Sequence, residues 1–432
     1  MTGLTTRRRL LQTGIATASA ICAGRFVRAG ESTPPSMDDV REKTLRFVES
    51  MRVTDGPYGR YRYAAGSKQP TLYSSTYAAM TRHLYRDLDL LTQTQRQEWI
   101  DYLQSHQDDD GLFRDPVIFG QGWYQDDPEW CGRRHLSCHV VTALTCLGAV
   151  AAKPMRFLDP FLEPGGLVRW LETRAWEDRP DFVGNEVLNL GTLMQYARDF
   201  QGEKRCGPAV RELLDWMAHH HINEQTGLWG KLDVNEPRGL SRAVMGGYHF
   251  WLLYFYDHVP IPYPERVVDS CLATQNAGGG FGQGVHTGSD GLSSACEDID
   301  SIDPLARLMQ VSDYRRDDIH RSLNRGLKQV LRNQTEDGGW WFVRGRGFTY
   351  GHEQLAAGAT EGAMFPTWFR TLTLAYLGKA LPDSIVGRYD WQFCNCPGIQ
   401  FWETNSVPLA RPPAAPCKPG TGRTAPASGS IM

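Results

Sequence analysis

The segment 295–303 concentrates acidic side chains that can do chemistry. Its sequence is Ala-Cys-Glu-Asp-Ile-Asp-Ser-Ile-Asp, with carboxyl groups at Glu297, Asp298, Asp300 and Asp303. Carboxylates this close together repel one another, which raises some pKa values enough to retain a proton. Such a group can act as a general acid. We therefore predict an acid catalyst here; the alternative is a helix N-terminus at which one or two acids act only as caps.

A pair of histidines forms a second candidate cluster. His135 and His139 stand four residues apart in a helix-like segment, so both side chains face the same way. Asn185, Glu186 and Asn189 lie close together in a later segment. We expect these groups to line a binding cavity as polar contacts, a base or metal ligands. The alternative is that the histidines are structural groups with satisfied hydrogen bonds.

A repeated pattern indicates the scaffold that must position these groups. Gln-x-x-x-Gly-x-aromatic begins at Gln107, Gln275 and Gln334, and Asn223 begins a copy with Asn in the first place. The last three copies start 52 and 59 residues apart, a period typical of repeated supersecondary units. The glycine supplies the positive φ with which a chain leaves a helix. We predict one large array of helical repeats.

Helical patterns alternate with loops rich in Gly, Pro and Asp, and convincing strands are scarce. The predicted helices are 37–52, 73–88, 93–106, 133–150, 184–200, 207–220, 240–257, 263–275, 295–311, 316–332 and 353–379. One kind of helix has a charged face and ends at a repeat. The other kind is rich in aromatic and small residues, and we assign it to an inner wall. Tyr248, Trp251 and Trp368 belong to this kind and can contact a substrate or stabilise a cation; a purely hydrophobic core role is the alternative.

The repeats at helix ends resemble those of the terpenoid cyclases, such as squalene-hopene cyclase, and of the protein prenyltransferase β-subunits. The resemblance covers about residues 70–380. It implies an all-α fold, an (α/α)6 toroid in which six outer helices surround six inner helices and a central cavity.

The terpenoid cyclases also suggest roles for the acidic segment. The acid motif of the class II enzymes is Asp-x-Asp-Asp, and this chain has Asp298-Ile-Asp300-Ser301, which departs from the motif in its last residue. The resemblance implies that Asp300 donates a proton and that Asp298 is its partner. The reaction would be acid-initiated cyclisation or isomerisation of an isoprenoid-type substrate.

The prenyltransferases imply a different use of the same region. They hold a catalytic zinc with Asp, Cys and His on inner helices, and Cys296, Asp298 and His352 are residues of these types. The order of Cys and Asp is reversed relative to that family. No other cofactor is expected. His352 and Glu353 are also candidates for polar cavity residues, with a solvated rim as the alternative.

Two further functions fit a toroid of this kind. An exported carbohydrate-active (α/α)6 lyase or glycosidase would use paired carboxylates with His or Tyr. A non-catalytic toroid would bind a small molecule or a glycan in its cavity. A fold alone does not decide between such functions.

Composition and the two ends of the chain complete the prediction. The net charge of −3, with both signs interspersed, gives no indication of a nucleic-acid partner. Residues 1–30 resemble a twin-arginine signal, with an apolar run too short to span a membrane. We predict export to the periplasm by the twin-arginine machinery, a toroid domain at 36–395 and a disordered tail rich in Pro, Gly and Ser at 396–432.

Overall fold

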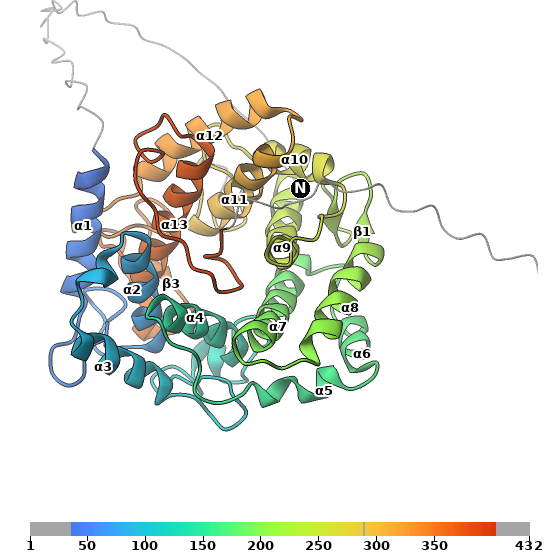
Figure 1. The fold of residues 1–432 in the computed structure, drawn as a ribbon. Helices are drawn as coiled ribbons and strands as arrows, with labels where there is room; N and C mark the ends of the chain where they lie inside the picture. Colours follow the sequence, from blue (N-terminus) through green and yellow to red (C-terminus); the bar gives the residue numbers. More distant parts are fainter. Residues whose placement is uncertain (1–35, 288–289, 403–432) are drawn as a thin grey trace, which may run out of the picture. The chain divides into compact units, whose positions relative to one another are not determined.

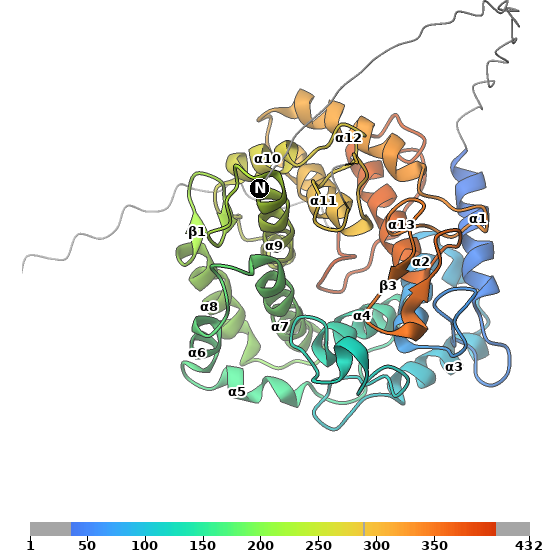
Figure 2. The same cartoon turned by 180° about the vertical axis from the view of Figure 1, so that it is seen from behind.

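A computed structural model describes residues 36–287 and 290–402, so the predicted signal at 1–30 lies outside the described residues. Within them, the inner helices form a closed ring (Figures 1 and 2). Each inner helix packs against the next, and the last packs against the first. The inner helices are α2 (Leu72–Leu84), α4 (Arg133–Cys146), α7 (Pro180–Phe200), α9 (Pro237–Tyr256), α11 (Ala295–Val311) and α13 (Met364–Ala380).

A second layer of helices covers the outside of this ring. Its members are α1 (Met37–Ser50), α3 (Gln93–Gln104), α5 (Asp159–Leu162) with α6 (Gly166–Glu172), α8 (Cys206–His219), α10 (Pro264–Ala273) and α12 (Arg316–Leu331). Two small antiparallel ribbons join β1 (Ile222–Asn223) to β2 (Leu228–Trp229) and β3 (Phe348–Thr349) to β4 (Ala356–Ala357). Single 3-10 turns are η1 (Asp87–Leu90), η2 (Gly122–Tyr124), η3 (Arg156–Leu158) and η4 (Glu353–Leu355). The predicted all-α (α/α)6 toroid is confirmed.

The burial pattern of the two layers follows their composition. Every residue of α2 is buried, and α13 is buried along almost its whole length, because their aromatic, apolar and small side chains have neighbours on all sides. By contrast, α12 buries one apolar stripe and exposes a charged face. Among the described residues, none of the helices combines the length and the hydrophobicity needed to cross a membrane.

Two expectations for individual helices are wrong. The helix predicted from 353 to 379 begins only at Met364, because the preceding residues form η4 and β4 and Gly362 packs directly on the backbone of Gly339. The short helices α5 and α6 were not predicted, since each is too brief to show a helical period.

The three Gln copies of the repeat share one geometry that ties neighbouring units together. Each Gln Nε2 donates to the carbonyl of the Gly in its own turn, at 2.8 Å for Gln107, 2.8 Å for Gln275 and 3.3 Å for Gln334. The same nitrogen also donates to the following part of the outer layer. Its acceptors are Lys153 O at 2.9 Å, in the loop before η3, Ser322 O of α12 at 2.8 Å and Val40 O of α1 at 3.1 Å, respectively. The last of these contacts joins the final repeat to α1 and so closes the outer layer.

The chain continues beyond the predicted domain boundary at residue 395. Residues 391–402 cover the end of the ring where the inner helices finish, and Figure 1 shows this segment reaching inward after α13. Gln400 is buried, accepts a hydrogen bond from Trp368 Nε1 at 2.7 Å and donates one to Met80 O at 3.2 Å. The predicted start of the tail at 396 is therefore wrong: Cys396 and Gln400 are buried against the inner helices. Residues 403–432 lie outside the described residues.

Replacing Gln334 by Leu tests the contact that closes the outer layer. The substitution leaves the carbonyls of Val40 and Gly338 without this donor, so we expect the free energy of unfolding to fall by about 1–3 kcal/mol. The matched control is Gln97→Leu on α3, whose exposed side chain bonds only within its own helix. Urea denaturation followed by circular dichroism measures both variants, and equal losses would contradict the assigned role.

Candidate active site

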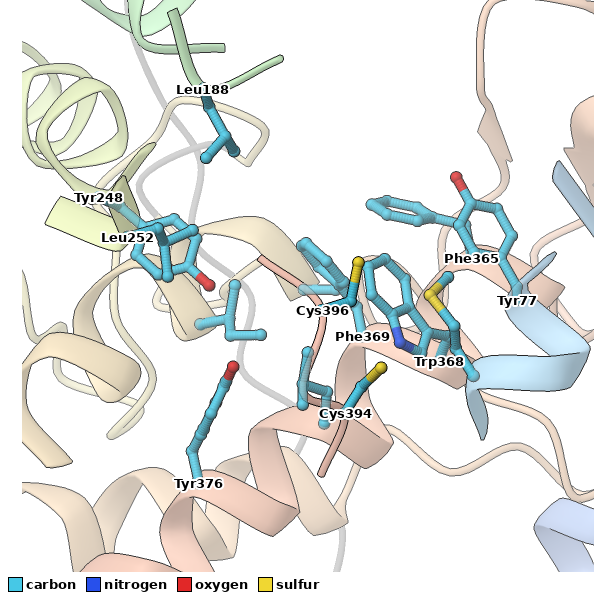
Figure 3. Packing of buried hydrophobic residues seen from close by; sticks show 14 of the residues in the cluster. Tyr77, Leu188, Tyr248, Leu252, Phe365, Trp368, Phe369, Tyr376, Cys394 and Cys396 are labelled. Atoms are coloured by element: carbon cyan, nitrogen blue, oxygen red, sulfur yellow. The ribbon is translucent and has the colours of Figure 1, made fainter. Parts of the chain in front are cut away.

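The inner helices enclose a cavity of about 390 Å³ whose wall is mainly apolar and contains many aromatic rings. Figure 3 shows Phe365, Trp368 and Phe369 of α13 facing Leu188 of α7 across open space. Trp368 also stacks on Tyr77 of α2, with ring centroids 5.3 Å apart. The further aromatic rings that line the cavity belong to Trp123, Trp130, Phe182, Phe342, Phe348 and Tyr350.

Asp300 is the member of the acidic segment that lines this cavity. It is 2% exposed, and its Oδ2 has no hydrogen-bond partner among the described residues. Burial, and then the nearby carboxyl groups of Glu297, Asp303 and Asp298, raise the pKa of Asp300 well above its ordinary value. The group therefore holds a proton at pH values where an exposed aspartate has lost it. This is the protonation state that the sequence predicts for an acid.

Asp298 has a different environment although it lies only two residues away. Its Oδ1 accepts from Phe281 N at 2.8 Å, and its Oδ2 accepts from Ser293 Oγ at 2.8 Å and from Arg370 Nη1. Asp298 and Arg370 are both fully buried. Asp298 does not line the cavity; its carboxylate is held by three donors in the wall between α11 and α13.

The contact between Asp298 and Phe281 repeats around the ring. Phe113 N donates to Ser137 Oγ at 2.9 Å, and Trp340 N donates to Thr367 Oγ1 at 3.2 Å. In each case the aromatic residue of a repeat is anchored by a side chain in the first turns of the next inner helix. Asp298 therefore anchors a repeat to the next inner helix, as Ser137 and Thr367 do at other places in the ring.

Glu297 and Asp303, predicted as part of the acid cluster, also lie outside the cavity lining. Glu297 forms a capping box with Ser294, the residue that precedes α11. Burial raises the pKa of Glu297, but hydrogen bonds from His286, Ser294 and Val285 N outweigh it, so the net shift is downward. Asp303 pairs with Arg307 at 2.7 Å, and burial raises its pKa to about 6 despite that guanidinium.

His135 and His139 line the cavity together, as their spacing predicts. Tyr73 OH lies 2.8 Å from His135 Nδ1, and Tyr350 OH lies 3.3 Å from its Nε2. Burial lowers both pKa values, that of His139 to about 3. Both rings are therefore neutral near pH 7.

On α7, two of the predicted polar residues line the cavity and one does not. Asn185 and Asn189 do, with their Nδ2 groups donating to backbone carbonyls of Trp130 and Glu129. Glu186 instead faces Arg174, with Oε2 3.4 Å from Nη1, because it lies on the side of α7 turned away from the cavity.

Of the remaining candidates for the cavity wall, which are Tyr248, Trp251, His352, Glu353 and Trp368, only Trp368 is a lining residue. Tyr248 and Trp251 are fully buried in the packing around α9, so the core alternative holds for them. His352 is buried in a loop, where its Nδ1 accepts from Gln354 N and its Nε2 lies 3.2 Å from Gln121 Oε1. Glu353 is exposed to solvent, as the rim alternative states.

The predicted zinc ligands are not brought together. Cys296 lines the cavity, whereas the Asp298 carboxylate is taken by its three donors and His352 by its loop contacts. Across residues 36–287 and 290–402, no cluster of three or more His, Cys, Asp or Glu has an arrangement suited to a metal. These residues therefore do not fit the zinc site that the prenyltransferases suggest.

Several important residues were not among the predicted site residues. Tyr73 and Tyr77 stand one helical turn apart on α2 and contact His135 and His139, respectively, so their spacing was an available signal. Arg370 carried no such signal, since its partner Asp298 is 72 residues away in the sequence.

Comparison with known proteins gives likeness of fold. No family model and no curated protein matches the chain. Similar solved structures include the type II terpene cyclase MstE from Scytonema, with 12% identity and a TM-score of 0.46 over 82% of this chain and 97% of that one. The α-1,6-mannanase GH76A from Salegentibacter sp. HEL1_6 has 10% identity and a TM-score of 0.42, over 79% and 98% of the two chains. Likeness at this level identifies no activity for this chain.

The raised pKa of Asp300 predicts a measurable effect of pH on stability. Above the pKa of the unfolded group, the folded protein still binds a proton that the unfolded chain has lost. Rising pH therefore destabilises the wild type by up to about 1.4 kcal/mol per pH unit until the folded pKa is reached. Asn cannot lose a proton in this range, so Asp300→Asn removes this pH dependence. The free energy of unfolding of the wild type should therefore fall relative to that of the variant between pH 5 and pH 8.

Urea denaturation at a series of pH values provides the test. Asp317→Asn, at an exposed position on α12, is the control and should run parallel to the wild type. A constant difference between the wild type and Asp300→Asn across this range would contradict a raised pKa.

Proposed function

We propose that the protein is an acid-initiated cyclase or isomerase of an isoprenoid-type substrate. The carrying observation is the Asp300 carboxyl group, which is buried, has a pKa raised by that burial and by neighbouring carboxyl groups, and belongs to the lining of a cavity that contains many aromatic rings. Its Oδ2 is buried and has no hydrogen-bond partner among the described residues. A neutral carboxylic acid in such a position can give its proton to a substrate carbon.

The proposed step balances without a cofactor. The O–H bond of Asp300 breaks as its proton forms a C–H bond with one carbon of an alkene, and the π bond supplies the electron pair. A carbocation remains on the other carbon, and a second alkene of the same chain attacks it to close a ring. Loss of a proton from the final cation restores an alkene, so the product is an isomer of the substrate. A later proton transfer from solvent reloads Asp300.

The cavity wall suits such an intermediate. The faces of Trp and Phe rings stabilise a cation by their electron density, and Phe365, Trp368 and Phe369 are all directed inward from α13. Within the described part of the chain, no Lys or Arg side chain lines the cavity. The wall therefore does not oppose the positive charge that the reaction would form.

A glycan-cleaving function has less support from the site. It would require two carboxyl groups facing the substrate. Of the four acids in segment 295–303, only Asp300 lines the cavity. The other acidic lining residue of the described chain, Asp181, forms a two-point ion pair with Arg242, at 2.9 and 3.1 Å.

Replacing Asp300 by Asn tests the proposed function. Purified protein is incubated with squalene, geranylgeraniol or uronic-acid oligosaccharides, and products are identified by mass spectrometry. We expect isomeric cyclised products from an isoprenoid and a loss of activity of about 10²–10⁴-fold in the variant. Asp317→Asn serves as the surface control.

Other results of this experiment would point elsewhere. Turnover of the oligosaccharides would support a glycan enzyme. Isoprenoid turnover that survives in Asp300→Asn would exclude Asp300 as the acid. Binding without any turnover by folded protein would favour a ligand-binding toroid.

We also propose that the chain is exported by the twin-arginine machinery. The support is the sequence Thr6-Arg7-Arg8-Arg9-Leu-Leu-Gln, followed by a weakly apolar run. Changing Arg7 and Arg8 together to Lys should leave the protein in the cytoplasm of an expressing bacterium, as measured by cell fractionation and immunoblotting. Arg9→Lys is the control that should still be exported, and export of the double variant would contradict the proposal.

A further inference from the structure

A stripe of polar residues runs along the cavity side of α7. Asp181, Asn185 and Asn189 follow one another at intervals of four residues and all line the cavity. Residues with this spacing lie on one face of a helix. This polar strip lies in a wall that is otherwise mainly apolar.

The two asparagines have a fixed orientation. Asn189 Nδ2 donates to Glu129 O at 3.1 Å, and Asn185 Nδ2 donates to Trp130 O. A backbone carbonyl can only accept, so the NH2 group of each amide must face it. The Oδ1 atoms are left as acceptors, with no partner in the part of the chain that the structure describes. Asn189 is 1% exposed, so water is largely excluded from this group.

His249 of α9 adds a further acceptor to the same cavity. Its Nδ1 lies 2.6 Å from Met245 O, which requires the ring proton to be on Nδ1. Burial lowers the pKa of His249 to about 4, so the ring is neutral near pH 7. Nε2 therefore has a free lone pair, and among the described residues no partner occupies it.

The positive groups near this strip are already engaged or lie outside the lining. Arg242 is bound to both carboxylate oxygens of Asp181 and to Asp178 O. The Arg179 guanidinium lies 3.8 Å from the centroid of the Phe182 ring, on an exposed residue that does not line the cavity. A diphosphate would meet lone pairs and a paired carboxylate here, whereas anion sites require cationic or N–H donors.

From these contacts we infer that the cavity binds its substrate by a neutral head group that donates hydrogen bonds, namely a hydroxyl, and not by a diphosphate. The hydroxyl donates its one hydrogen to Asn189 Oδ1, the most deeply buried of these acceptors, and Asn185 Oδ1 and His249 Nε2 are further acceptors in the lining of the same cavity. The inference rests on the proposed function for the isoprenoid tail and specifies the polar end. A buried acceptor left unpaired is costly, so a site built in this way discriminates strongly against a ligand that lacks the donor.

Three ligands with the same tail separate the contributions. Geranylgeraniol donates a hydrogen bond, its methyl ether cannot, and geranylgeranyl diphosphate carries a charged head. Binding is measured by isothermal titration calorimetry on full-length Asp300→Asn protein, so that turnover does not consume the ligand. We expect the alcohol to bind at least about tenfold more tightly than either of the other two ligands.

Variants of the strip connect this preference to named atoms. Asn189→Leu keeps a similar volume but removes the acceptor, so the alcohol and the ether should bind with nearly equal affinity. Met245→Leu, an apolar lining residue, is the matched control and should retain the preference. Where Asn189→Leu does not fold, the affinities of the parent protein for the alcohol and the ether still test the inference, because that comparison needs no further variant.

The outcomes separate this inference from the proposed function. Equal binding of alcohol and ether by the parent protein would overturn the inference, and so would tighter binding of the diphosphate that weakens in Arg179→Ala. Either result leaves isoprenoid cyclisation by Asp300 intact. Conversely, preferential binding of the alcohol without any turnover by the wild-type protein would support the binding strip and reject the cyclase.

Discussion

The buried ion pair between Asp298 and Arg370 is the interaction on which the rest of the site depends. Two charges without solvent exposure require complete pairing, and Asp298 receives donors from the third repeat, from the loop before α11 and from α13. This requirement fixes the rotation of α11 about its axis. Successive helical residues turn by about 100°, so Asp300 emerges about 200° from Asp298 and faces the cavity. The ion pair of Asp298 with Arg370 thus determines where the Asp300 carboxyl group lies.

The same helix gives its acids three different environments. Asp298 is held by fixed donors, Asp300 lacks a partner for Oδ2, and Asp303 lies one turn further along. Asp303 pairs with Arg307, whose Nη2 donates to Phe401 O at 2.6 Å in the C-terminal segment. The three acids of α11 therefore have different roles. Asp298 anchors the start of the helix, Asp300 lines the cavity, and Asp303 connects through Arg307 to the C-terminal segment that covers the end of the ring.

The spacing of the repeats predicted an array of helical units, the resemblance to the terpenoid cyclases specified it as a toroid, and the acidic segment could be recognised as a candidate site because its residues are adjacent in the sequence. The period of the Gln repeats and the adjacency of Asp298 and Asp300 are visible in a single chain. Partners in the folded chain are not visible in this way. Nothing near Asp298 identifies Arg370, which is 72 residues away, and the spacing of Glu186 does not show that it faces Arg174 and not the cavity. The domain boundary was misplaced for the same reason, since the polar Gln400 is buried through contacts with the distant helices α2, α4 and α13.

The bond from Gln334 to Val40 has a consequence for assembly of the molecule. It joins segments 294 residues apart, and the inner ring likewise closes only when α13 reaches α2. A chain synthesised from its N-terminus therefore carries the first units of the ring with one flank uncovered until nearly the whole body has been made. Contacts between such distant segments form late and slowly, because the segments must meet before the contacts can stabilise them. The first repeats are thus the part of the molecule most exposed to misassembly during synthesis.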